Sequence, residues 1–297
     1  RQMCIRDSYD KLTDPLLAAV SVPSSVGSKR VMTNVGSQRT QGVSGTVKYS
    51  PVYHPEERIN WTLSASFKHQ KAKYEDIGNS LDQFNKENLN TSLVRYYDGG
   101  SPTALWAVRS LGINPSDGRE LFLTKEGTYT FEYDTEDEVV VGNSEPKLEG
   151  VLGSTLYWKG FSFSLYFRYS LGADVFTEAT YNKVENISLA GLKSNQDKRA
   201  LHDRWQKPGD HAKFKGISLT ETTPISSRFV LRENYIKAES ISVGYDFESQ
   251  AVQKLGIQSL RLQANTTDLF RISSIKEERG IEYPFARSFS FSLSAMF

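Results

Sequence analysis

Apolar and polar residues alternate along several stretches of the chain, and this period of two is the pattern of a β-strand with one apolar face. The clearest stretch is the last one, in which serines alternate with larger apolar residues. Its apolar positions are Phe289, Phe291, Leu293, Ala295 and Phe297. Six further stretches alternate in the same way, centred on residues 43–49, 59–67, 148–158, 161–169, 241–247 and 260–264. With a less regular strand expected over residues 9–20, the pattern predicts about eight strands.

The connections between these strands alternate between short and long. Short links are expected at residues 50–58, 157–160 and 248–258, whereas long polar segments cover 70–146, 170–234 and 266–286. Compact soluble domains seldom contain irregular loops of this length, but membrane barrels combine short turns on one side with long loops on the other. Strand parity therefore predicts that the long loops emerge together, at the end opposite Trp158 and the 248–258 link.

We therefore predict an all-β fold, an antiparallel transmembrane β-barrel architecture with about eight strands in this chain. Its apolar residues should face outward in one belt. Members of this belt would be Phe163, Leu165, Tyr245, Leu262, Phe291 and Leu293. A soluble β-sandwich also has strands with one apolar face, which it buries between two sheets. The position of the belt residues would distinguish the two folds.

Composition excludes other classes of protein. No run approaches the roughly 18 apolar residues of a membrane-spanning helix, and the mean hydropathy is −0.47, so a helical membrane protein is excluded. The absence of a long apolar run does not exclude a β-barrel, because only every second residue of a barrel strand faces lipid. The formal net charge of +1 gives no argument for a nucleic-acid partner.

The first eight residues resemble translated adapter sequence, and they contain the only cysteine of the chain, Cys4. We expect residues 1–8 to be non-native and assign residues 9–297 to the barrel. Disulfides and cysteine-based metal sites or nucleophiles are then excluded together.

Catalysis finds little support in the sequence. The four histidines, His54, His69, His202 and His211, lack the spacing of a metal site. The acidic run at residues 134–138 lacks the spacing and the glycine of a calcium loop, and such runs usually form a solvated face. Since no Ser/His/acid set can be assembled either, we expect no enzyme, no metal site and no cofactor.

Four motifs follow one another along the chain: Tyr9–Asp14 with Asn34-Val35-Gly36, then Val141–Pro146 with Tyr157–Phe161, then Arg228–Tyr245, and finally Tyr283–Phe297. Their order and spacing resemble the C-terminal barrel of SusC/RagA-family TonB-dependent importers, and this resemblance implies a transmembrane β-barrel fragment, with about eight strands of a larger barrel. The resemblance covers residues from about Tyr9 to Phe297, which would make 9–297 the C-terminal part of a TonB-dependent receptor barrel.

This resemblance implies a twenty-two-stranded barrel in the outer membrane of a Gram-negative bacterium, with an N-terminal plug and a segment that contacts TonB. It also implies a SusD-like surface lipoprotein that covers the barrel, and import of glycans, peptides or similar oligomers. Because strand tilt and shear fix the width of a barrel, strands from a wider circle should form an open sheet here. A soluble β-rich carbohydrate-binding module is the alternative function, and an outer-membrane enzyme is the third.

Aromatic and arginine residues in the long loops are candidates for ligand binding, because rings and planar donors suit sugars and peptides. These candidates are Tyr96, Tyr97, Trp106, Arg109, Arg204 and Trp205. The alternative is that they pack the loops on one another or on the lipoprotein. The terminal residue, Phe297, resembles the signal by which outer-membrane barrels are recognised for assembly, and packing at the membrane rim is again the alternative.

Overall fold

The structure is a computed structural model that describes residues 2–21, 30–78, 80–218, 220–247, 256–276 and 287–297. Long antiparallel strands dominate it, and one nine-stranded sheet contains most of them. The strands of this main sheet are β1 (Gln2–Thr13), β4 (Ser37–His54), β5 (Ile59–Glu75), β10 (Leu148–Trp158), β11 (Phe161–Phe176), β12 (Val230–Phe247), β13 (Ser259–Thr267), β14 (Arg271–Ser273) and β15 (Ser288–Met296).

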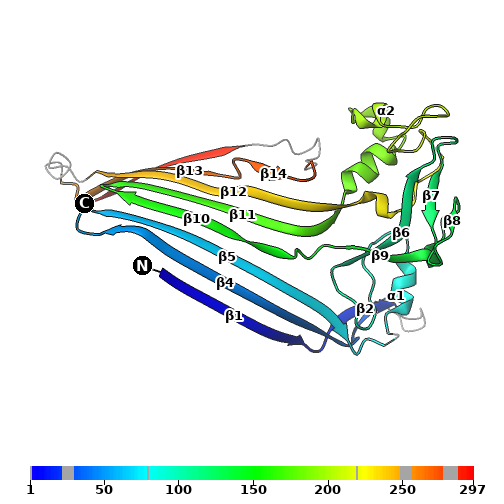
Figure 1. Ribbon diagram of the computed structural model, residues 1–297, viewed down its shortest axis with the longest axis horizontal. Helices are drawn as coiled ribbons and strands as arrows, with labels where there is room; N and C mark the ends of the chain where they lie inside the picture. The colour runs from blue at the N-terminus through cyan, green and yellow to red at the C-terminus, as the bar shows by residue number, and fades with distance from the viewer. Residues whose placement is uncertain (1, 22–29, 79, 219, 248–255, 277–286) are drawn as a thin grey trace.

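The main sheet follows the order of the chain, β1-β4-β5-β10-β11-β12-β13-β15, and β14 folds back to pair with β12 (Figure 1). Seven of the eight predicted strands are β4, β5, β10, β11, β12, β13 and β15, so the fold class is confirmed. The bounds of the eighth, expected over residues 9–20, are wrong: β1 begins at Gln2 and ends at Thr13, and residues 17–21 belong to a separate hairpin beyond Pro15, which has no backbone N–H to continue the ladder. Within the described residues β1 and β15 form the two edges and do not pair, so the sheet is open, as expected.

The remaining elements lie in the long loops. A four-stranded sheet of order β8-β7-β6-β9 is built from β6 (Ala104–Ile113), β7 (Glu120–Leu123), β8 (Tyr129–Thr130) and β9 (Glu138–Asn143). A hairpin pairs β2 (Leu17–Ser21) with β3 (Arg30–Asn34). The helical segments are α1 (Asp82–Glu87), α2 (Arg199–His202), the π-helix η3 (Thr180–Glu185) and the 3₁₀ turns η2 (Thr135–Asp137), η4 (Gly191–Lys193) and η5 (Ser227–Phe229). None of the described helices is long and apolar enough to cross a membrane.

The register places the predicted belt residues on one face of the main sheet. Across β11, β12, β13 and β15, one row contains Phe161, Tyr245, Leu262 and Leu293. The next row contains Phe163, Val243, Ala264 and Phe291. Opposed residues of an antiparallel pair share a face, so these rows form a continuous apolar belt. No second sheet covers the belt in the described chain, since Leu293 is 68% exposed and Phe291 77% exposed.

The height of the belt matches a membrane. On β11 it runs from Phe161 to Leu171, and its register with β10 is unbroken over that span. Ten residue steps of about 3.3 Å give a length of about 33 Å along the strand. A strand tilt of about 40° reduces this length to a vertical height of about 25 Å, which is the apolar height expected of an outer-membrane barrel.

The opposite face of the sheet is polar. Serines and other polar residues alternate with the belt residues there, and ion pairs cross between neighbouring strands. Lys68 of β5 lies 3.2 Å from Glu149 of β10, and Arg168 of β11 donates through Nε to Glu239 of β12 at 3.0 Å. Glu239 is the extra residue of a bulge, because Tyr166 pairs with Ser240 whereas Phe167 pairs with Ala238. This face would line the interior of a barrel.

The long loops gather at one end of the main sheet, where β6 to β9, α1 and α2 lie together (Figure 1). The tight turn between Trp158 and Phe161 and the C-terminus lie at the opposite end (Figure 1). The parity prediction is therefore confirmed for the first two long loops. Residues 248–255 of the last short link, and residues 277–286 with part of the final motif, lie outside the described residues.

Most of the buried apolar residues lie in the loops and at the loop-proximal ends of strands rather than on the belt. They form three clusters, around Ile77 and Leu81, around Leu105 and Ala107, and around Val184 and Phe229. A barrel wall one sheet thick has no interior of its own, whereas loops of this length can fold over a small core. The predicted polar excursions are thus folded structures.

The first strand reverses polarity within the segment expected to be non-native. Met3 and Ile5 lie opposite Lys48 and Thr46 on the polar face, whereas Cys4 and its neighbour Arg6 lie on the belt face. In a strand that evolved as part of this sheet, the apolar residues would lie on the belt face and the polar residues on the opposite face. The reversed phase continues at Tyr9 and Asp10, so the non-native origin of residues 1–8 stays a prediction.

Candidate ligand-binding groove

The first long loop is held together by a buried ion pair. Arg95 donates to Glu138 through Nε and Nη2, at 2.9 and 2.8 Å, and both side chains are buried. Its Nη1 donates to the carbonyl oxygens of Ser92 and Val94, at 2.7 and 2.9 Å. This bidentate geometry fixes the chain before β6 against the start of β9.

The helix α1 is fixed to the same segment through one side chain. Buried Asn85 donates through Nδ2 to the carbonyl of Tyr96 at 2.7 Å, and its Oδ1 accepts from the amide of Tyr96 at 2.9 Å. The ring of Tyr96 packs against Tyr74 and Phe84, with centroid distances of 5.4 Å in both cases. Tyr97, the next residue, projects outside this cluster and is 42% exposed.

A groove of ≈ 1240 Å³ opens between these elements. Its walls are α1, the turn from Thr124 to Thr128 and the segment from Thr135 to Val140. Its apolar part is an aromatic pair, Tyr97 and Trp106, whose ring centroids are 5.1 Å apart and whose planes make an angle of 55°. Val140 lies opposite Trp106 in the β6–β9 register and is half exposed. Tyr97 is exposed and Trp106 is partly buried, and an accessible aromatic pair in a concave surface is a usual platform for a ligand.

Charged side chains surround this platform. Asp82, Glu126, Glu136 and Asp137 contribute carboxylates to the lining, and Lys86 and Lys125 contribute ammonium groups. Asp137 accepts a hydrogen bond from the backbone amide of Lys125 at 2.9 Å, which holds the Thr124–Thr128 turn against η2. Glu138 also borders the groove, but Arg95 neutralises it.

The structure brings together two of the six candidate residues. Tyr97 and Trp106 form the platform, whereas Tyr96 belongs to the adjacent cluster. Arg109 is exposed and pairs with Leu123 between β6 and β7, outside the residues that line the groove.

Arg204 and Trp205 have structural contacts in the second long loop. Buried Arg204 donates to the carbonyls of Lys215 and Glu185, both at 2.8 Å. Trp205 donates through Nε1 to the carbonyl of Pro115 at 2.9 Å and packs over Gly118, where a Cβ would meet its ring at 2.5 Å. Trp205 therefore joins the second loop to the first. Sequence reasoning did not identify the carboxylates and lysines of the groove as ligand-binding candidates, because an acidic run in a loop is usually a solvated face.

A second connection between the loops is centred on Arg228, which precedes β12. Its Nη2 donates to Glu120 of β7 at 2.9 Å and to Glu185 of η3 at 3.0 Å. Ser226 and Thr223 donate to the same two carboxylates. Burial alone would lower the pKa of the Arg228 guanidinium, but its hydrogen bonds to Glu185 and Glu120 outweigh that effect and raise the pKa. The cation is therefore permanent.

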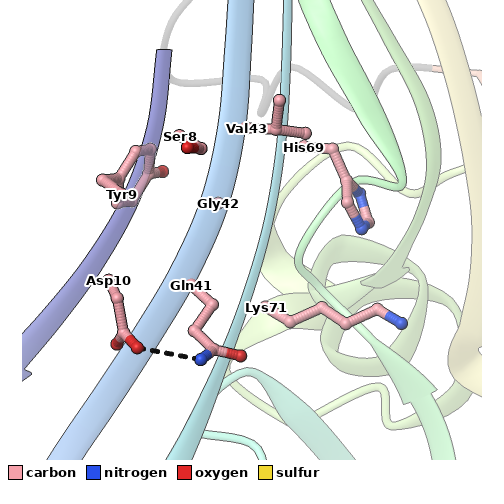
Figure 2. A pocket seen from close by; sticks show the side chains of 8 residues that line it. All are labelled: Ser8, Tyr9, Asp10, Gln41, Gly42, Val43, His69 and Lys71. Carbon is pink, nitrogen blue, oxygen red and sulfur yellow. Dashed lines mark hydrogen bonds between the residues drawn. The ribbon is translucent and has the colours of Figure 1, made fainter.

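A smaller pocket of ≈ 510 Å³ lies on β1, β4 and β5, where the side chains of Asp10, Gln41 and Lys71 extend over the strands (Figure 2). Arg39 and Gln41 both donate to Asp10, at distances from 2.6 to 3.1 Å. These residues share the face of the belt but lie beyond Val43 toward the loops. The pocket therefore marks the loop-side boundary of the apolar belt.

Phe297 follows directly after β15 and is exposed. Its role in assembly stays a prediction.

The chain was compared with known proteins. No protein-family model matches it. TonB-dependent receptor P39 of Formosa agariphila is 22% identical, over 90% of this chain and 30% of that protein. TonB-dependent receptor P26 of the same organism is 25% identical, over 90% of this chain and 28% of that protein. The chain thus spans less than a third of the length of the curated relatives it matches.

Solved structures have the same fold. The RagAB peptide transporter superposes with a TM-score of 0.74 and 18% identity, over 93% of this chain and 30% of that chain. The RagAB peptide importer in its closed-closed state gives a TM-score of 0.73, over 92% of this chain. The chain is therefore similar in sequence to TonB-dependent receptors, and its fold is that of part of a RagAB transporter chain.

Proposed function

We propose that this chain forms part of the wall and the external loops of an importer in the outer membrane of a Gram-negative bacterium. The substrate is an oligomeric nutrient, a glycan or a peptide, and energy comes through TonB acting on other parts of the receptor. A SusD-like lipoprotein covers the loop end, and the chain performs no chemistry on its substrate. The observation that carries this proposal is the continuous exposed belt with both long folded loops at one end of its strands.

The groove between α1 and the β6–β9 strands is the substrate contact that this chain contributes. Its platform consists of Tyr97 and Trp106, which the chain leaves accessible although it buries other loop aromatics such as Phe229. Loss of one ring from an aromatic contact costs roughly 0.5–1.5 kcal/mol beyond its buried area. In the full-length receptor, Trp106→Ala should therefore reduce affinity for the imported oligomer by roughly 2- to 12-fold.

The test uses the full-length receptor with its surface lipoprotein, purified in detergent and also assayed for uptake in cells. Oligopeptides and oligosaccharides are offered separately, and binding and uptake are measured for wild type and Trp106→Ala. Tyr129→Ala is the matched control, because Tyr129 lies in the same loop, is 72% exposed and does not line the groove. Equal uptake by both variants and wild type would remove the groove from the transport route.

A soluble carbohydrate-binding module is the second candidate function, because aromatic platforms also bind glycans. The behaviour of the protein without detergent distinguishes an importer wall from a soluble module. An importer wall with an exposed belt should aggregate without detergent and incorporate into lipid vesicles, whereas a soluble module should stay monodisperse in buffer and bind glycans there.

A further inference from the structure

The groove contains an aromatic platform and an excess of negative charge. Four of its carboxylates, those of Asp82, Glu126, Glu136 and Asp137, belong to no ion pair among the described residues. Only two ammonium groups, Lys86 and Lys125, line the same surface. A neutral glycan can donate its hydroxyls to these carboxylates but has no charge for the excess to attract, and an anionic ligand is repelled by it.

A cationic side chain suits both parts of the lining. A guanidinium or ammonium group is attracted to the faces of Trp and Tyr rings, and carboxylates beside the ring supply its hydrogen-bond acceptors. Tyr97 and Trp106 supply the rings here, and Glu136 and Asp137 lie on the wall formed by η2.

The same loops already contain two arginines that each lie over a ring and bind a carboxylate. Arg228 lies over the ring of Phe229, 4.5 Å from its centroid, and two carboxylates bind its guanidinium. Arg119 lies over Phe131 at 4.2 Å and binds Asp117 at 2.8 Å. In each case a ring and an acid hold an arginine of the chain itself. The groove presents rings and acids, and the lysines that line it have no ion-pair partner in the described part of the chain.

We propose that this groove binds an arginine- or lysine-bearing segment of an oligopeptide. The cationic side chain lies against the Tyr97–Trp106 pair, and the carboxylates of the η2 wall neutralise it. This inference rests on the proposed function, because it names the substrate class of the groove proposed as the substrate contact. It goes further by assigning the selectivity to charge.

The test measures binding of three synthetic heptapeptides to the full-length receptor with its lipoprotein. The peptides are identical except for a central arginine, citrulline or glutamate, and citrulline keeps the shape of arginine without its charge. The arginine peptide should bind roughly 5- to 10-fold more tightly than the citrulline peptide at about 0.1 M salt. The difference should shrink at about 1 M salt, and the glutamate peptide should bind most weakly.

A double variant, Glu136→Gln with Asp137→Asn, removes two charges and keeps the oxygen that accepts from Lys125. It should reduce the preference for arginine over citrulline, which the rings then support only with Asp82 and Glu126, while leaving citrulline binding unchanged. Glu132→Gln is the matched control, because Glu132 is an exposed carboxylate of the same loop outside the groove lining. The control should keep the full preference.

The outcomes separate this inference from the function on which it rests. Equal binding of the arginine and citrulline peptides, with Trp106→Ala weakening both, would refute the charge selectivity and leave the groove as a substrate contact. A chitosan tetramer that binds more tightly than any peptide would assign the groove to amino sugars and overturn the inference. Binding of all three peptides that is indifferent to Trp106→Ala would refute the groove as a substrate contact, and the inference with it.

Discussion

Replacement of Arg228 by methionine should release the two long loops from each other while leaving the main sheet intact. The guanidinium binds Glu120 of the first loop and Glu185 of the second at 2.9–3.2 Å. The side chains of Arg228, Glu120 and Glu185 are 12%, 2% and 0% exposed. Without the cation, two carboxylates are left buried and uncompensated.

The expected cost follows from this burial. Breaking a buried ion pair by removing one partner costs roughly 3–5 kcal/mol, because the remaining charge has lost both water and its counter-ion. Hydrogen exchange of β6, β7 and η3 should therefore accelerate by about 100- to 4000-fold in the full-length receptor. Amides of β10 and β11 should keep their protection, since their ladder does not depend on the loops.

Two further variants test the reasoning. Arg232→Met removes a pair with Asp174 in which the arginine side chain is 58% exposed, so it should change exchange by no more than about fivefold. The triple variant Arg228→Met, Glu120→Gln, Glu185→Gln should recover part of the protection, because no buried charge remains. Unchanged exchange in Arg228→Met, or equal acceleration in β10 and β11, would refute this account of how the loops are held.

Two other predictions concern β15. Leu293→Arg places a charge at the centre of the apolar face of the strand and should destabilise the receptor in lipid by roughly 2–4 kcal/mol, measured by urea unfolding in vesicles. Ser292→Arg, on the polar face, should be tolerated. Equal costs for the two variants would mean that the faces are wrongly assigned. Deletion of Phe297 or its replacement by aspartate in the full-length receptor should reduce insertion in cells while refolding into lipid in vitro is retained. Equal losses in both assays would make Phe297 a packing residue, and unchanged insertion would contradict the assembly role.

The sequence alone determined seven long strands of the main sheet and their two faces, but not the strands inside the loops. A period of two is a local property, so Phe161, Phe163 and Leu165 specify one side of β11 whatever their partners are. The alternation predicted strands that are too short, because charged residues such as Lys73 in β5 and Glu233 in β12 interrupt it while the backbone hydrogen-bond ladder continues. Backbone hydrogen bonds do not depend on side-chain polarity.

Only the tertiary structure decided which loop residues meet. Tyr97, Trp106 and Asp137 come from three separate segments of the first loop and line one groove, whereas Arg204 and Trp205, with the same chemistry, are committed to internal carbonyl oxygens. A local pattern records which face of a strand a residue occupies. It does not record which distant acceptor satisfies a guanidinium or an indole, because that pairing depends on how the chain closes over its small cores.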